Sequence, residues 1–524
     1  MNDKHGRPVR IAGLTGSGRG HARWPLALIM AVALVLRLVL ASRMTVLHAD
    51  EIWQYLEPAY GLVTGSWVRA WEFKAGIRGW LVPLVLTGPI ALGHALAPHS
   101  QLHIWLMRAM LALIALGIPL AWYDLARGLG RRHAIVAGWV GAIWCEVFYF
   151  AARPSAEAIG LSLLFPAMAL AQRLRRPAPR LAPRLAPHQA RPDHHTRTAI
   201  GLGVLLALGF VVRFHYLPAI ALIAWWGAGR APRTTLPAVA SGAACGIALG
   251  GLADMVTGHP PLLWIWRSIT FNVVEGGSAM FGTQPPWWFA TYQVATWSWA
   301  ALAIVPLALI AARRRPMLLA IALAVFVPHS LIAHKEYRFV ILGTTTLVLL
   351  AAIGSVDVLD GLQRRRIVPG GWPALAALGL GWVGLDLVVA LSAIFFPLWT
   401  QGNDAFTTLV IAGQQPGICG LAVYDLPAHP ALAMSLFNRK VPALLFDGPE
   451  AAAEAHAMAG RYNVAIASQT AGADLPAGYR LVTCWAQEDF NIEDRDSCVF
   501  VRAGGCRGTV GDFAYQPAME RRGK

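Results

Sequence analysis

Charged residues are scarce in this chain: Asp, Glu, Lys and Arg make up 14% of its 524 residues, whereas soluble domains carry about 25%. Hydrophobic residues make up 56%, and the mean hydropathy is +0.50. This composition excludes a disordered chain, a coiled coil and a typical cytosolic enzyme. The class that remains is a polytopic membrane protein.

Acidic residues are scarcer than basic ones. There are 28 Asp and Glu against 44 Lys and Arg, which gives a formal net charge of +16. A basic chain can bind nucleic acid, but here the basic residues form short clusters between apolar runs, as the positive-inside rule requires of cytoplasmic loops. We therefore expect a lipid bilayer, and no nucleic acid, among the partners.

Cysteine is also sparse, with six residues in the whole chain. Cys145 and Cys245 lie inside apolar runs and are most simply interpreted as small hydrophobic residues. The other four follow the last long apolar run: Cys419, Cys484, Cys498 and Cys506. In an oxidising compartment they could form up to two disulfides, in any of three connectivities. No Cys or His spacing indicates a metal site, and nothing indicates haem, flavin or nucleotide chemistry, so we expect no cofactor.

Long apolar runs predict about eleven transmembrane helices. They lie at about residues 24–41, 104–126, 134–150, 157–172, 199–215, 216–228, 234–254, 291–312, 317–333, 337–354 and 373–398. The first is expected to be uncleaved, with a cytoplasmic N-terminus. A further run at 80–98 contains Pro83, Pro89 and Gly93. A crossing there would place the cluster Arg131-Arg132 outside the cytoplasm, against the positive-inside rule. We expect this run to be re-entrant or interfacial.

The runs and loops divide the chain into three parts. A cytoplasmic tail at 1–23 precedes a membrane domain at 24–398. The membrane domain has outer loops at 43–79 and 255–290 and a Pro- and Arg-rich cytoplasmic linker at 173–198. After 399 the pattern changes: β-rich runs at 420–424, 441–446, 463–467 and 498–501 surround a helix-like segment at 450–459. This predicts a small soluble α/β domain at 399–524, on the periplasmic or extracellular side of the inner (cytoplasmic) membrane.

Acidic residues cluster in the first outer loop, directly after the first span. The cluster consists of Asp50, Glu51, Glu57 and Glu72. Neighbouring carboxylates at a membrane surface suit general-base catalysis, because one can take a proton from a nucleophile while the others set its pKa. The alternative is a solvated juxtamembrane loop among interfacial aromatic residues.

A basic motif at 334–339 lies between two apolar runs with no room for a loop of its own. Its cationic side chains are His334, Lys335 and Arg338. They could hold a phosphate at the outer leaflet, with Arg338 as a bidentate donor and Lys335 as a point charge. The alternative is that these cations snorkel from a helix end.

Two further features lie at the outer ends of the spans. The second outer loop is rich in Gly, Pro and aromatic residues, which suits either a sugar-stacking surface or an interfacial tryptophan belt. Arg153 with Glu157, and Arg213 with His215, are more typical of helix-end or helix-packing pairs than of ligand sites.

Four segments together carry a recognisable set of motifs. In chain order they are His48-Ala-Asp50-Glu51-x-x-Gln54-x-x-Glu57-Pro58, then Trp71-Glu72-Phe73 with Gly76-Ile77-Arg78, then Asn272 with Phe281-Gly282-Thr283, then 334–339. They are similar to the HPDE...Q..EPAH, WEF...GIRSWLYP, N...YGT..W and HKE.RF motifs of glycosyltransferase family 22, the mannosyltransferases of GPI-anchor and N-glycan assembly; Trp288 follows the third segment. The resemblance spans roughly residues 25–345 and is strongest to the GPI type, and we expect a bacterial member.

The resemblance implies an all-α polytopic GT-C fold whose donor is a polyprenyl-phosphate-linked sugar. We expect an inverting transfer of mannose or a similar hexose to a glycan or glycolipid acceptor. Asp50 would be the general base, with Glu51 as second candidate, and the basic motif would bind the donor phosphate. The remaining motif positions are expected to bind substrate: His48, Gln54, Glu57, Glu72, Arg78, Asn272 and Trp288.

A secondary transporter or lipid carrier is the alternative from a different class, because buried charges can also form a substrate path. Two observations oppose it: the sequence shows no paired halves, and the acids concentrate at one surface. A non-catalytic member of the family is a third interpretation, which the intact Asp50, Glu51 and Arg338 oppose.

Overall fold

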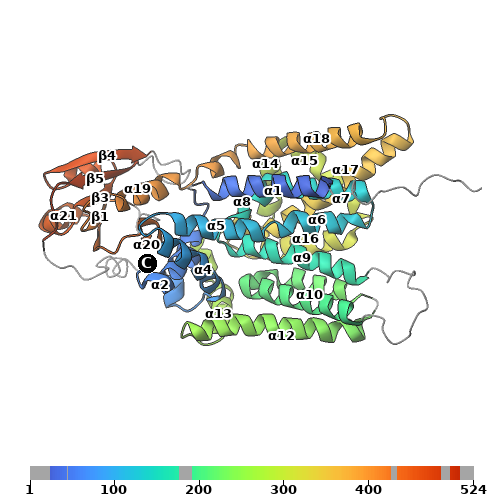
Figure 1. Ribbon diagram of the computed structural model, residues 1–524, viewed down its shortest axis with the longest axis horizontal. Coiled ribbons are helices and arrows are strands. Elements are labelled where there is room, and N and C mark those ends of the chain that lie inside the picture. The colour runs from blue at the N-terminus through green and yellow to red at the C-terminus, as the bar shows by residue number, and fades with distance from the viewer. Residues whose placement is uncertain are drawn as a thin grey trace, which may run out of the picture.

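The protein is a long helical bundle with a small α/β domain at one end (Figure 1). This computed structural model describes residues 24–43, 45–175, 192–229, 231–426, 433–485 and 496–507. The predicted N-terminal tail at 1–23 and most of the predicted linker at 173–198 lie outside the described residues.

Each of the eleven predicted runs is mainly helical. The bundle helices are α1 (Trp24–Ala41), α5 (Leu102–Ile114), α6 (Gly117–Arg127), α7 (Arg131–Ile143), α8 (Cys145–Ala151), α9 (Ala156–Arg175), α10 (Pro192–Val212), α11 (Leu217–Ala228), α12 (Pro232–Val256), α14 (Trp288–Trp297), α15 (Ala301–Ala312), α16 (Pro316–Leu331), α17 (Ile341–Arg364) and α18 (Trp372–Ala390). Within the described residues, seven helical stretches are long and apolar enough to cross a bilayer, or eight if the bent pair α7 and α8 forms one span. The polytopic helical class is therefore confirmed, whereas the number eleven stays a prediction.

The elements of the two outer loops gather at the end of the bundle that carries the α/β domain (Figure 1). They include α2 (Glu57–Thr64), α3 (Trp71–Lys74) and α13 (Leu263–Ile269), and α4 (Leu81–Leu96) follows the first loop. The turn between α17 and α18 lies at the opposite end. Helix α4 has 16 residues, contains Pro89 and packs against α2 and α5. The expectation that the run at 80–98 does not cross the membrane stays a prediction.

A buried arginine in the first span has a structural role. Arg37 is fully buried and donates to the carbonyl oxygens of Ala33 at 3.1 Å, Ala142 at 3.1 Å and Gly141 at 3.0 Å. The last two belong to the final turn of α7, where the chain bends by 55° into α8. Carbonyl groups at such a break lack helical partners, and inside a membrane they need another donor. Arg37 supplies it.

The C-terminal part forms a five-stranded sheet in the order β2-β1-β3-β5-β4. Its elements are α19 (Asn403–Gly413), β1 (Leu421–Tyr424), α20 (Met434–Phe437), β2 (Ala443–Phe446), α21 (Ala451–Ala457), β3 (Val464–Ala467), β4 (Tyr479–Trp485) and β5 (Ser497–Arg502). Strands β2, β1 and β3 are parallel, and β5 runs antiparallel to β3 and β4. The predicted α/β character is confirmed, since all four predicted strands are present.

Two disulfides connect the four C-terminal cysteines. Cys419 is bonded to Cys506, and Cys484 is bonded to Cys498 on the neighbouring strand. This is one of the three connectivities that the sequence left open. Among the described residues Cys145 and Cys245 are free; Cys145 is buried, whereas Cys245 is exposed.

We predict that peptide mapping of the unreduced protein recovers these two pairs and thiols at Cys145 and Cys245. The Cys419–Cys506 bond closes a separation of 87 residues and the other bond one of 14. Loop-closure entropy then predicts that replacing Cys419 and Cys506 by Ser costs about 1.5 kcal/mol more than replacing the other pair. Urea unfolding measures the difference, with Cys245→Ser as control. Recovery of a different connectivity would contradict the assignment.

Candidate active site

One buried guanidinium is the centre of the polar residues at the end of the bundle that carries the α/β domain. Arg338 lies in the turn before α17, and its Nη2 is 2.6 Å from Oδ2 of Asp50 in the first outer loop. Its Nε is 2.6 Å from Oε2 of Glu336, and its Nη1 is 3.8 Å from Oε2 of Glu157 at the start of α9. Three carboxylates from three parts of the chain therefore share one arginine.

Two histidines complete this group on its more open side. His48 lies 3.4 Å from Asp50 and 3.6 Å from Glu336, and its side chain is 39% exposed. Nε2 of His334 is 2.9 Å from Oε1 of Glu336. The partly exposed side chains of His48, Asp50 and Glu336 leave this face accessible to a substrate.

The electrostatics keep the central carboxyl groups ionised. Burial raises the pKa of Asp50, but Arg338 and His48 outweigh it and hold that pKa well below its usual value. The pKa of Glu336 is lowered in the same way, because Arg338 and His334 outweigh its burial. Asp50 is thus available as a proton acceptor, but its basicity is reduced while Arg338 remains paired with it.

Lys335 differs from the other two cations of its motif. It is buried, and its Nζ donates to the backbone carbonyls of Gln284, at 3.2 Å, and Ile332. Burial lowers its pKa. Within the described part of the chain it forms no ion pair, whereas Arg338 and His334 both contact carboxylates. Of the three predicted phosphate ligands, Lys335 is therefore the one whose positive charge is not paired with a carboxylate among the described residues.

Glu51 points away from Asp50. Its carboxylate accepts from Arg153 at 3.0 Å and from the backbone N–H of Leu47 at 2.9 Å, and both ionic side chains are 4% exposed. The expected pairing of Arg153 with Glu157 is therefore wrong. Glu157 instead lies 3.0 Å from Arg213, which was expected to pair with His215. The pairs form between elements rather than along one helix.

A second polar group lies beside the centre. Gln54 donates to Glu72 at 3.1 Å, and Arg78 lies 3.9 Å from the same carboxylate. Arg78 also contributes to the low pKa of Asp50, and its side chain is 33% exposed. Burial raises the pKa of Glu72. The structure thus brings three predicted substrate-binding residues close to the candidate base.

The second outer loop reaches the basic motif through its backbone and an aromatic ring. Nδ1 of His334 lies 3.3 Å from the carbonyl oxygen of Gly282, and the ring of Phe281 is 5.9 Å from the His334 ring. The two residues predicted from this region make other contacts: Asn272 donates to the carbonyl of Ser268, and Trp288 stacks on Tyr292. No contact of Asn272 or Trp288 with Asp50 is found among the described residues.

Glu57 faces the α/β domain rather than the candidate base. It is fully buried, and its carboxylate accepts from the backbone N–H and hydroxyl of Ser435, both at 2.6 Å, and from the N–H of Val68 at 2.8 Å. Burial raises its pKa to about 7. Both of its oxygens are occupied within the protein.

Residues 28–398 match the model of the Alg9-like mannosyltransferase family. The chain belongs to the Alg9-like mannosyltransferase family. The predicted resemblance to glycosyltransferase family 22 is thereby confirmed. Since the matched region covers most of the chain, it contains both outer loops and the basic motif.

Curated Alg9-like relatives include GPI alpha-1,2-mannosyltransferase 3 of Bos taurus, which is 23% identical over 301 residues, covering 56% of this chain and 52% of the relative. GPI mannosyltransferase 3 of Yarrowia lipolytica is 25% identical over 306 residues, covering 56% of each chain. The chain spans about half the length of the curated relatives it matches.

Among solved structures, ArnT from Cupriavidus metallidurans bound to undecaprenyl phosphate is similar, with a TM-score of 0.54 and 14% identity. The similarity covers 93% of this chain and 100% of ArnT. It confirms the predicted GT-C fold for this Alg9-like protein.

Sequence reasoning missed two members of the central group. Glu336 lies inside the recognised motif, and an acid between three cations was a signal of internal pairing. The sequence places Glu157 four residues after Arg153 and therefore suggested an ion pair between them. A pairing with a residue far along the chain gives no such local signal. The contact of Glu157 with Arg338 joins residues 181 positions apart.

We predict that Glu57 makes stability depend on pH. Because burial raises its pKa from 4.5 to about 7, the folded protein holds this proton more tightly than the unfolded chain, and the resulting stability is lost as pH rises through that range. This rise in the pKa of Glu57 corresponds to about 3 kcal/mol in the free energy of unfolding. The midpoint of thermal unfolding should fall from pH 5 to pH 8, and Glu57→Gln should reduce the fall. The control is Glu454→Gln, at an exposed position of α21; an unchanged pH dependence in Glu57→Gln contradicts the prediction.

Proposed function

We propose that this protein is an inverting membrane glycosyltransferase. It transfers mannose, or a similar hexose, from a polyprenyl-phosphate donor to a hydroxyl group of a glycan or glycolipid on the extracytoplasmic side. The observation that carries the proposal is the pairing of Asp50 with Arg338, at 2.6 Å, at the outer end of a membrane bundle. The Alg9-like family and the mannosyltransferases among its relatives support the reaction type.

In the proposed reaction the acceptor hydroxyl oxygen attacks the anomeric carbon of the donor. Asp50 takes the hydroxyl proton as the new glycosidic bond forms, and the bond from the anomeric carbon to the phosphate oxygen breaks with its electron pair going to that oxygen. The lipid phosphodiester thus becomes a phosphomonoester with an additional negative charge. A single displacement of this kind inverts the anomeric configuration.

Arg338 and Lys335 are proposed to stabilise the charge that develops on the phosphate, with His334 as a third donor. Arg338 has a second effect in this arrangement. A donor phosphate close to Arg338 competes with Asp50 for the same guanidinium, so the basicity of Asp50 increases once the donor is bound. The base is therefore weak in the empty enzyme and becomes effective when there is a sugar to transfer.

Gln54, Glu72 and Arg78 lie on the same side as Asp50 and are proposed to orient the sugar or the acceptor hydroxyl. Asp50 is proposed as the base in preference to Glu51, since both Glu51 oxygens contact Arg153 inside the protein. The transporter interpretation receives no such support, because family membership and the one-sided cluster of acids both favour a transferase.

The proposed orientation places the α/β domain and both outer loops outside the cytoplasm of a bacterial cell, with the N-terminus inside. Two disulfides in the C-terminal domain support this orientation, because they persist in oxidising compartments. The domain limits at 24–398 and 399–524 remain part of the proposal.

We predict that Asp50→Asn lowers kcat by at least about 100-fold, because the amide cannot accept the hydroxyl proton. The assay supplies purified protein with radiolabelled polyprenyl-phosphate mannose and membrane glycolipids. It measures the labelled product and the released polyprenyl phosphate, which should form in equal amounts. Asp474→Asn, at an exposed position of the α/β domain, is the matched control. Near-normal transfer by Asp50→Asn removes this residue from the role of base.

We predict that Lys335→Met lowers kcat by about 10-fold to 100-fold, because the departing phosphate loses a cation that no carboxylate neutralises. Steady-state kinetics with the same donor measures the loss, and Lys440→Met in the α/β domain is the control. Unchanged kcat for Lys335→Met contradicts the phosphate-binding role.

A further inference from the structure

The α/β domain inserts a short segment against the first outer loop. This segment consists of α20 and the following Asn438, and it is almost completely buried: Ser435 is 0% exposed and Asn438 is 2% exposed. Helix α20 lies beside α2 in Figure 1. The contact therefore joins the domain of so far unassigned role to the loop that carries Asp50.

The first link of this contact is a buried carboxylate. Ser435 donates both its backbone N–H and its hydroxyl to Oε1 of Glu57, while Val68 donates to Oε2. Glu57 begins α2 directly after the π-helical turn Glu51–Leu56, which itself follows Asp50. All three hydrogen bonds are buried, so breaking one of them would leave a polar atom without a partner inside the protein. The helical unit that starts at Asp50 is thus anchored to the α/β domain.

Further hydrogen bonds fix the orientation of the inserted segment. Tyr60 of α2 donates to Oδ1 of Asn438 at 3.0 Å, and Asn438 donates to the carbonyl of Ser100 at 2.7 Å. Gln101 and His103 contact the carbonyl oxygens of Leu436 and Ser435 at 3.0 and 2.8 Å. Side chains of the inserted segment and of the membrane domain thus form hydrogen bonds across the contact.

A second link holds the chain on the other side of Asp50. The N–H of Val46 donates to the carbonyl of Gln401 at 3.0 Å, and Nε2 of Gln401 donates to the carbonyl of Leu47 at 3.0 Å. Gln401 lies two residues before the start of α19, the first helix of the C-terminal part. The segment with Asp50 is consequently held both before and after the candidate base.

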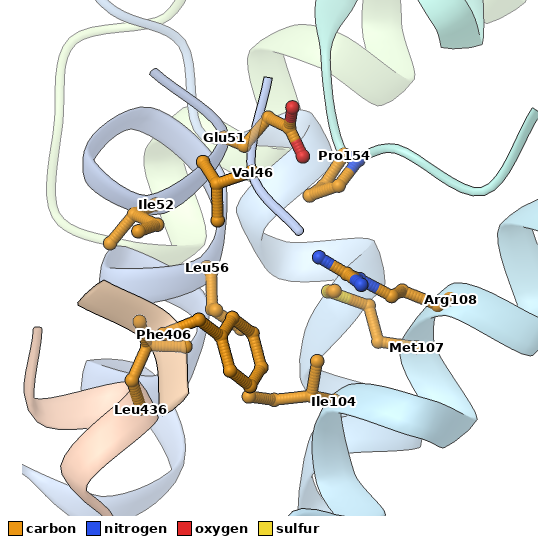
Figure 2. A pocket seen from close by; sticks show the side chains of 10 residues that line it. All are labelled: Val46, Glu51, Ile52, Leu56, Ile104, Met107, Arg108, Pro154, Phe406 and Leu436. Atoms are coloured by element: carbon orange, nitrogen blue, oxygen red, sulfur yellow. The ribbon is translucent and has the colours of Figure 1, made fainter. Parts of the chain in front are cut away.

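Apolar packing between the two links leaves little free space. Figure 2 shows Phe406 and Leu436 facing Ile52 and Leu56 across a cavity of about 10 Å³. This volume is about the least that admits one water molecule. The loop can therefore shift little in this direction while the α/β domain remains in place.

We propose that the α/β domain is a positioning element of the active site, with Ser435 and Gln401 as its positioning residues. They hold the backbone around Asp50 so that its carboxylate meets Arg338 and the acceptor hydroxyl. A displacement of 1 Å at a reacting group can lower a rate by about 100-fold. This inference rests on the proposed function for its effect on catalysis, but the mechanical link itself does not depend on the reaction.

The experiment compares Ser435→Ala and Gln401→Ala with the wild-type full-length protein in the mannosyl-transfer assay. Each variant is expected to lower kcat by about 10-fold and to change the KM for the donor by less than about twofold, since Lys335 and Arg338 lie outside the contact. Ser497→Ala is the matched control. Its buried hydroxyl belongs to the same domain and lies 3.0 Å from Thr408, away from the first outer loop.

Hydrogen exchange of peptides covering residues 45–60 provides a readout that needs no catalysis. Exchange there should increase at least about threefold in Ser435→Ala and Gln401→Ala, since backbone amides freed from the contact open more often, and should stay unchanged in Ser497→Ala. Absence of transfer by the wild-type protein overturns the proposed function. Equal exchange in Ser435→Ala and Ser497→Ala, or unchanged kcat in both test variants, overturns the positioning role.

Discussion

The arrangement of polar residues at the end of the bundle that carries the α/β domain depends on one buried arginine. A guanidinium taken out of water must be paired, because an uncompensated buried charge is strongly destabilising. Arg338 satisfies this constraint with Asp50, Glu336 and Glu157, which come from the first outer loop, its own motif and α9. The same contacts place a candidate base, a candidate phosphate-binding cation and helix α9 within one group. Stability and the proposed chemistry therefore use the same side chain.

The rest of the molecule keeps this group in place. Where a bundle helix is interrupted, its free carbonyl groups are paired inside the protein, as Arg37 pairs those at the end of α7. This charged residue in a span therefore stabilises the backbone and does not form a path across the membrane. The α/β domain contacts the first outer loop on both sides of Asp50 through Gln401 and Ser435. A domain outside the family match thereby contacts the loop that carries the candidate base.

Local patterns in the sequence predicted the helices, four strands of the sheet and the motif residues. Strand β4 was missed because it is an edge strand whose side chains are largely exposed, so it lacks the apolar run that marks β1, β2 and β3. Asp50, His48 and Arg338 were predicted as one site from motifs, and the structure brings them together. The predicted role of Glu57 remains without support, and the partners of Glu51, Glu157 and Glu57 could not be predicted, because each pairs with a residue about 60 to 380 positions away. Such pairings depend on tertiary packing, which periodicity and composition do not encode.

The central claim is that a donor phosphate and Asp50 share Arg338. The most direct measurement is a cryo-electron microscopy structure of the full-length protein with polyprenyl phosphate, the proposed leaving group. We predict phosphate oxygens within hydrogen-bond distance of Arg338 and Lys335, and a separation between Arg338 and Asp50 longer than 2.6 Å. A phosphate bound elsewhere, with the Asp50–Arg338 pair intact, would contradict the account.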